Sequence, residues 1–181
     1  MYIAEQLKKQ SISEYLLYLW QVEDTIRAYN LDADRMEREY VPLFKLDNER
    51  ASKLKEWYEG LISMMHEEGV EKQGHLMVNK SIIVYLADLH SQLLRSPKHP
   101  FYSAAYYKAL PFIVELRAKS EDSQQKNEIE NCFDALYGVM LLRMQKKEVS
   151  AETAAAIDNI AHLIGLLSDY YKKEKAGELE F

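Results

Sequence analysis

The sequence predicts an all-α protein, a multi-helix antiparallel bundle of six to seven helices with no β-sheet. Only 6 glycines and 4 prolines occur in 181 residues, so helix-breaking positions are few. In the stretches between them, apolar residues recur every three to four positions, which is the period of a helix. A content of 48% hydrophobic and 29% charged residues is typical of a globular protein. We expect a single helical domain over residues 1–181, with short flexible ends at about 1–10 and 175–181.

The first predicted helix, from Ile12 to Tyr29, is unusually apolar. Ser11 and Glu14 have the spacing of a capping box at its start. The run YLLYLW over residues 15–20 covers the whole circumference of a helix, because successive residues are about 100° apart. Its outer face can be covered by other helices of the same chain, by a second copy or another protein, or by a ligand. The candidate interface residues are Tyr15, Tyr18 and Trp20.

The remaining helices are bounded by capping residues and by glycine or proline. Asp32 and Ser150 are suited to cap two of them, and another begins near Asp47. Pro111 lacks an amide proton and crowds a carbonyl group one turn earlier, so a kink or break is expected there. Short connections favour antiparallel packing of neighbouring helices. The predicted ranges are about 32–41, 47–68, 75–96, 101–119, 124–146 and 150–171.

Charge and cysteine content narrow the compartment and the partners. A net charge of -6, with lysine pairs near helix ends, argues against nucleic acid as a partner. Cys132 is the only cysteine, which excludes an intrachain disulfide and fits a reducing compartment. Glu5 falls where a signal peptide is apolar, and no uncharged stretch approaches the roughly 18 residues that span a bilayer. We expect a cytoplasmic protein with no membrane partner.

Four polar residues are the candidates for a pocket between helices. Glu23 follows Leu19 by four residues and should point towards the apolar side of its helix, where a carboxylate needs a partner. Arg27, one turn later, is the nearest partner, and a simple ion pair is the alternative to a functional carboxylate. His90 and Tyr106 complete the set, and His75 with Asn79 is a further candidate pair. Core packing is the alternative for each.

No motif in the sequence predicts catalysis, a metal or a cofactor. None of the 5 histidines stands in Glu-x-x-His or His-x-x-x-His spacing, so no metal ligands are predicted. Glycine-rich phosphate loops and nucleophile elbows are missing from the sequence, so no catalytic residue is predicted. An enzyme is therefore the less favoured class.

The beginning of the sequence resembles a known family. The segments YIAEQLKK at 2–9 and SEYLLYLWQVEDTIRAY at 13–29 are similar to an uncharacterised all-helical family, a domain of unknown function from Bacteroides-type bacteria. The resemblance implies a cytoplasmic bacterial protein, and it brings no activity, cofactor or site residues.

The sequence supports two functional hypotheses. The surplus of apolar helix surface favours a non-enzymatic protein-interaction module that self-associates as a homo-oligomer or binds another protein. The alternative is a helical bundle that binds a small molecule or metal in a pocket between helices, for which Glu23, Arg27, His90 and Tyr106 would have to converge.

Overall fold

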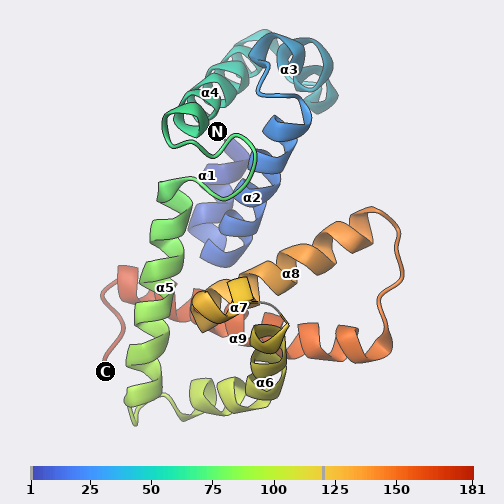
Figure 1. Cartoon of the computed structure of the whole chain (residues 1–181). Helices are drawn as coiled ribbons and strands as arrows, with labels where there is room; N and C mark the ends of the chain where they lie inside the picture. Colours follow the sequence, from blue (N-terminus) through green and yellow to red (C-terminus); the bar gives the residue numbers. More distant parts are fainter. Residues whose placement is uncertain (1, 120) are drawn as a thin grey trace. The chain divides into compact units, whose positions relative to one another are not determined.

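The computed structural model of the chain describes residues 2–119 and 121–181. Within these residues it contains nine α-helices, one short 3-10 helix and no strand, which confirms the all-α class (Figure 1). The helices are α1 (Tyr2–Gln10), α2 (Ile12–Ala28), α3 (Ala33–Glu39), η1 (Val41–Phe44), α4 (Asn48–Glu67), α5 (Met77–Arg95), α6 (Pro100–Ala118), α7 (Glu121–Gln125), α8 (Glu128–Met144) and α9 (Ala151–Lys175).

The described residues contain more helices than predicted for two reasons. Residues 2–10, expected to be a flexible end, form α1, whose last turn carries Lys8 and Lys9 where cations complement the helix dipole. Residues 124–146, expected to be one helix, are divided because the side chain of Asn127 accepts a hydrogen bond from the amide of Glu130 and caps α8. The predicted caps Asp32 and Ser150, and Asp47 at the predicted start of another helix, each accept the amide hydrogen bond of an N-cap.

The last residues, expected to be flexible, make specific contacts in the structure. The ring of His99 lies 6.2 Å from that of Phe181, centroid to centroid. Its Nε2 is also 2.9 Å from the carbonyl oxygen of Glu180. These contacts place the end of the described chain beside the start of α6.

Helix α6 continues through Pro111, which lies inside it. Figure 1 shows the ribbon of α6 changing direction partway along its length. The sequence predicted either a kink or a break at Pro111. The change of direction agrees with a kink, and the helix is not broken.

Two compact units divide the described chain. Unit 1 contains residues 2–10 and 14–81, and unit 2 contains residues 11–13, 82–119 and 121–181. The core of unit 1 is formed by α2, α3, η1, α4 and the segment that comes after α4. In unit 2, α9 packs against α6 and α8. Each fully buried large aliphatic side chain in either core stabilises the fold by roughly 1.5–3 kcal/mol.

Candidate functional site

Glu23 is the most deeply buried carboxylate of unit 1, with 1% of its surface exposed. Its Oε1 accepts hydrogen bonds from the backbone amide of Leu76 at 3.0 Å and from Nδ2 of Asn79 at 2.6 Å. Its Oε2 lies 2.6 Å from Nδ1 of His75. The carboxylate therefore organises the segment that leads into α5, since its partners come from three of five consecutive positions.

Arg27 binds the backbone just before this segment. Its Nη2 donates to the carbonyl oxygens of Val70 at 3.0 Å and Gly74 at 2.5 Å, and its Nη1 pairs with Asp24 at 2.8 Å. Gly74 has φ 85°, a backbone conformation that favours glycine. The sequence correctly placed Glu23 on the buried side of its helix, but Arg27, the partner suggested for it, instead binds Asp24 and backbone carbonyls.

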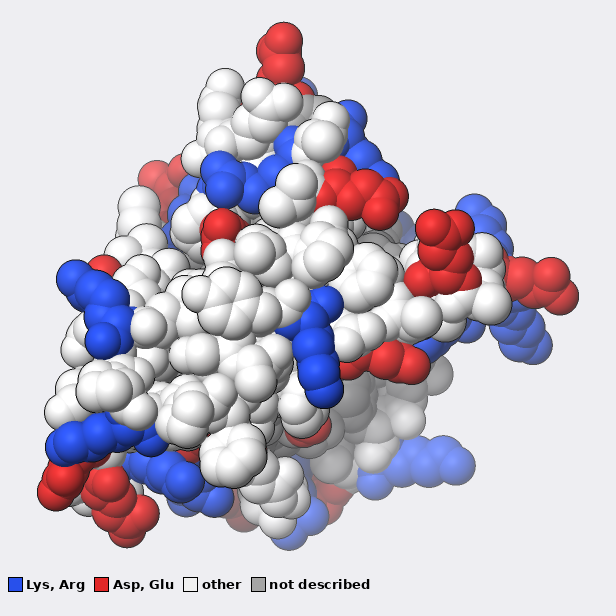
Figure 2. All heavy atoms as spheres, turned by 90° about the horizontal axis from the view of Figure 1, so that it is seen from below, with Lys and Arg blue, Asp and Glu red and all other residues white. Residues whose placement is uncertain are grey.

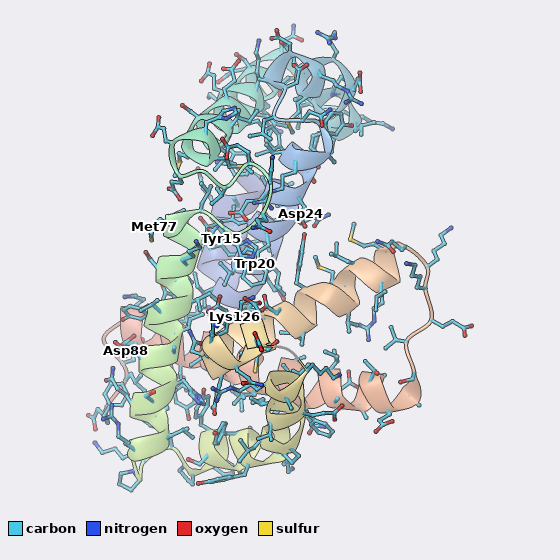
Figure 3. The ribbon with its side chains drawn as sticks, viewed as in Figure 1. Tyr15, Trp20, Asp24, Met77, Asp88 and Lys126 are labelled. Carbon is cyan, nitrogen blue, oxygen red and sulfur yellow. The ribbon has the colours of Figure 1, made fainter. Side chains whose placement is uncertain are left out.

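The three aromatic residues of α2 that were proposed as an interface have partners within unit 1. Trp20 is 2% exposed and its ring stacks on that of His75, with centroids 4.0 Å apart and planes 9° apart. Tyr18 packs against the core of unit 1, and its burial raises the pKa of its hydroxyl to about 12. Tyr15 and Trp20 project from α2 in Figure 3, near the start of α5 at Met77. Trp20 therefore contributes to folding and offers no surface to a partner.

A cavity of about 270 Å³ lies beside Glu23 in unit 1. Glu23 and Asn79 line it together with Glu5 and Lys8 of α1 and with apolar and aromatic side chains from α1, α2, α4 and α5. The apolar lining residues include Tyr15, Leu19, Trp57, Leu61, Met64 and Leu76. Oδ1 of Asn79 is buried and has no hydrogen-bond partner within the described chain. The cavity thus combines apolar walls with an unpaired acceptor, the usual composition of a small-molecule site.

A second polar cluster lies in unit 2 and contains His90 and Tyr106. Nδ1 of His90 is 2.6 Å from the hydroxyl of Tyr102, and its Nε2 is 3.7 Å from Oε2 of Glu128. Tyr106 donates its hydroxyl hydrogen to Glu128 at 3.0 Å, and Arg117 approaches the other carboxylate oxygen at 3.7 Å. The four predicted pocket residues are therefore divided between the two units, with Glu23 and Arg27 in unit 1 and His90 and Tyr106 in unit 2.

Burial controls the protonation of this second cluster. Removal from water lowers the pKa of His90, although Glu128 opposes that shift. Burial, together with the hydrogen bond to Glu128, raises the pKa of Tyr106 to about 12. Cys132, fully buried beside the cluster on α8, has its pKa raised to about 12 by burial. These groups are neutral at pH 7, so the cysteine is not the thiolate that nucleophilic catalysis requires.

The described part of the chain also contains no group of three or more His, Cys, Asp or Glu side chains arranged to hold a metal ion. In the same residues no helix has both the length and the apolar character needed to cross a bilayer.

An apolar surface on α6 was not predicted from the sequence. The inner side of this helix is buried at Tyr102, Ala105, Ala109 and Ile113. The outer side carries a further row of exposed residues, namely Phe101, Ala104, Tyr107, Pro111, Val114 and Ala118. The face in Figure 2 is largely free of charged side chains across its centre. The signal was available in the sequence, because apolar residues between 101 and 118 form two helical stripes on opposite sides.

The chain belongs to the family described as Domain of unknown function (DUF4924), whose model matches residues 1–178. The match covers nearly the whole chain and agrees with the resemblance carried by the first thirty residues. No curated protein and no solved structure matches the chain.

Proposed function

We propose that the protein is a non-enzymatic helical module that pairs with a second copy of itself through the outer face of α6. The carrying observation is the exposed apolar row on that face, which we call the α6 stripe: Phe101, Ala104, Tyr107, Pro111, Val114 and Ala118. Phe101, Tyr107 and Val114 are 83%, 67% and 58% exposed. Scattered exposed apolar residues are ordinary, whereas a continuous row at helical spacing is typical of a surface that a partner covers.

The charges beside the stripe indicate what kind of partner fits. Lys108 and Glu115 are both exposed and lie seven residues apart, on the same edge of the stripe. Two α6 helices that cross antiparallel, with the two-fold axis between Pro111 and Val114, would bring Lys108 of each copy opposite Glu115 of the other. One surface supplies both halves of the complementary pair, which is what a two-fold interface requires. The same surface is therefore complementary to itself.

Side-chain size supports the same alignment. The antiparallel crossing that pairs Lys108 with Glu115 also sets the ring of Tyr107 against the methyl group of Ala118. Large residues opposite small ones allow two helices to interdigitate closely. Glu115 is free to exchange partners, because its pair with Lys119 at 3.6 Å joins two exposed side chains and such pairs contribute little.

Charge reversal tests the proposal in analytical ultracentrifugation over a range of concentrations. We expect wild-type protein to dimerise and Lys108→Glu to weaken the dimer about tenfold, since two like-charge contacts form per dimer. Glu115→Lys should have a similar effect, and the double variant Lys108→Glu/Glu115→Lys should restore dimerisation. Lys172→Glu, an equivalent charge change on an exposed residue of α9, is the matched control. A wild-type monomer at every concentration, or a dimer indifferent to both reversals, contradicts the proposal.

Disulfide trapping tests the antiparallel orientation. Tyr107→Cys and Ala118→Cys are made as separate variants and then mixed under oxidising conditions. The mixture should form cross-linked dimers far faster than either variant alone, because antiparallel pairing sets residue 107 of one copy against residue 118 of the other and keeps the two copies of each residue apart. The native Cys132 is buried and gives little background. Rapid self-cross-linking of each variant would instead indicate a parallel pair.

A further inference from the structure

The cavity in unit 1 presents hydrogen-bond acceptors that its own chain does not use. A carboxylate has about four acceptor positions, and Glu23 uses three of them, for the amide of Leu76, Nδ2 of Asn79 and Nδ1 of His75. Asn79 lines the cavity, and because it donates its amide group to Glu23, its buried Oδ1 is left without a partner in the described chain. A ligand that enters this cavity beside Glu23 and Asn79 therefore has to donate hydrogen bonds.

Among ligands that donate hydrogen bonds, the charge of the site favours a cation. Neither Arg27 nor Lys8 is placed on Glu23, since Arg27 binds Asp24 and carbonyl groups and the ammonium of Lys8 lies 5.6 Å from the centre of the Tyr15 ring. Within the described structure His75, which is partly exposed, is the only basic side chain in contact with Glu23. A buried carboxylate gains from a further cation, because charge is costly in a low-dielectric environment.

The cavity walls indicate the kind of molecule that carries the cation. Tyr15 and Trp57 supply aromatic rings, whose faces attract cations, and the ammonium of Lys8 already lies over one of them. Leu19, Leu61 and Met64 supply an apolar surface that suits a hydrocarbon chain. We infer that this cavity binds a small primary amine with an apolar tail, its ammonium group donating to Asn79 Oδ1 and Glu23 and its tail lying between α2 and α4.

A single bound water does not account for the cavity. One water molecule could satisfy Asn79 Oδ1, but its share of liquid volume is about 30 Å³. The cavity measures about 270 Å³, and most of its lining is apolar. Space of this size beside an unpaired acceptor fits a molecule with one polar end.

Lys8 is an internal competitor of the inferred ligand. Its side chain lines the cavity from α1 and carries the same chemical group as the inferred ligand. Removing that ammonium should therefore strengthen the binding of an added amine. A purely structural role for Lys8 predicts no such gain.

Calorimetric titration with matched six-carbon ligands tests the inference on the unaltered protein. Hexylammonium should bind with one-to-one stoichiometry, at least about tenfold more tightly than 1-hexanol, which donates one hydrogen bond and carries no charge. Hexanoate should not bind, because it offers only acceptors. Equal affinity for hexylammonium and 1-hexanol would overturn the choice of a cation, and no binding of hexylammonium would overturn the site.

Two variants assign the binding to Glu23 and Lys8. Glu23→Gln, which keeps the shape, should reduce hexylammonium affinity about tenfold and leave 1-hexanol binding unchanged. Lys8→Met should raise hexylammonium affinity several-fold. Glu56→Gln, an exposed carboxylate of α4 outside the cavity lining, is the matched control for the loss of charge. If Glu23→Gln does not fold, the ligand series and the Lys8→Met result still decide the question.

The amine site and the proposed pairing surface on α6 lie in different units. The cavity belongs to unit 1, whereas the α6 stripe belongs to unit 2. Sedimentation of the Lys108 and Glu115 variants tests one surface, and calorimetry of the Glu23 and Lys8 variants tests the other. A negative result in either experiment leaves the other unaffected.

Discussion

Both units contain a histidine beside a carboxylate, but the buried partner is different in each. In unit 1 the side chain of Glu23 is 2% exposed and that of His75 is 26% exposed. In unit 2 the side chain of His90 is 7% exposed and that of Glu128 is 29% exposed. In unit 1 the carboxylate is buried and the histidine is in partial contact with water. In unit 2 the histidine is buried and the carboxylate is in partial contact with water.

This difference determines what surrounds each pair. A buried carboxylate needs several donors, so Glu23 gathers a backbone amide, an amide side chain and an imidazole around itself. A buried histidine is most stable when neutral, so His90 needs only one close hydrogen bond, with Tyr102, and its pKa falls. The buried member of the pair in unit 1 is therefore a carboxylate held by several donors, whereas the buried member in unit 2 is a histidine whose burial favours its neutral form.

Removing the carboxylate of Glu23 should produce the largest loss of stability. Glu23→Ala leaves the amide of Leu76 and Nδ2 of Asn79 buried without an acceptor, which we expect to cost roughly 3–5 kcal/mol. Glu23→Gln retains one oxygen and should cost about 1–2 kcal/mol. Urea denaturation monitored by circular dichroism measures both values. Glu56→Ala, at an exposed site on α4, should change stability by no more than about 0.5 kcal/mol.

Equal effects of Glu23→Ala and Glu56→Ala would show that the carboxylate does not organise this segment. Hydrogen exchange provides a local measurement of the same point. The amide of Leu76 should lose protection in Glu23→Ala, because its acceptor is removed.

The corresponding change in unit 2 should have a smaller effect. Tyr102→Phe removes the hydroxyl group that lies 2.6 Å from Nδ1 of His90 and leaves that nitrogen buried without its close partner. The expected loss is about 1–2 kcal/mol in urea denaturation, because neither group of this hydrogen bond is charged. Tyr107→Phe, a hydroxyl deletion on an exposed residue of the same helix, should be nearly neutral. A loss from Tyr102→Phe as large as that from Glu23→Ala would contradict the distinction between the two units.

The features that could be predicted from sequence are those set by neighbouring residues. Helical spacing predicted the fold class, and Asp32, Asp47 and Ser150 predicted three helix starts. Spacing also placed Glu23 on the buried side of its helix. The partners of Glu23 depend on the path of the chain between α4 and α5, which helical spacing does not specify. His75 and Asn79 were plausible pocket residues from sequence, but their shared contact with Glu23 is a tertiary feature.

Two other features show where helical spacing was incomplete. The short helix α1 was missed because nine residues contain few apolar repeats. The α6 stripe was missed because Tyr102 and Ala105 already satisfy the helical period on the inner face, and the outer row repeats the same period half a turn away. A helix apolar on two opposite sides is the sequence signal of a surface that extends beyond its own core.

Acid should weaken the protein through His90, with the smallest effect of the series. The pKa of His90 lies below the ordinary value of 6.5 because burial disfavours the imidazolium form. Between that lowered pKa and 6.5 the unfolded chain binds more protons than the folded chain, so stability rises with pH and falls on acidification. From pH 7.5 to 5.5 we expect His90 to account for a loss of up to roughly 1 kcal/mol. The measurement is the urea midpoint of wild-type protein and of His90→Gln at each pH, since other titrating groups cancel in the difference. The variant should lose less stability than the wild type over this range, and parallel curves would show that burial does not keep His90 neutral.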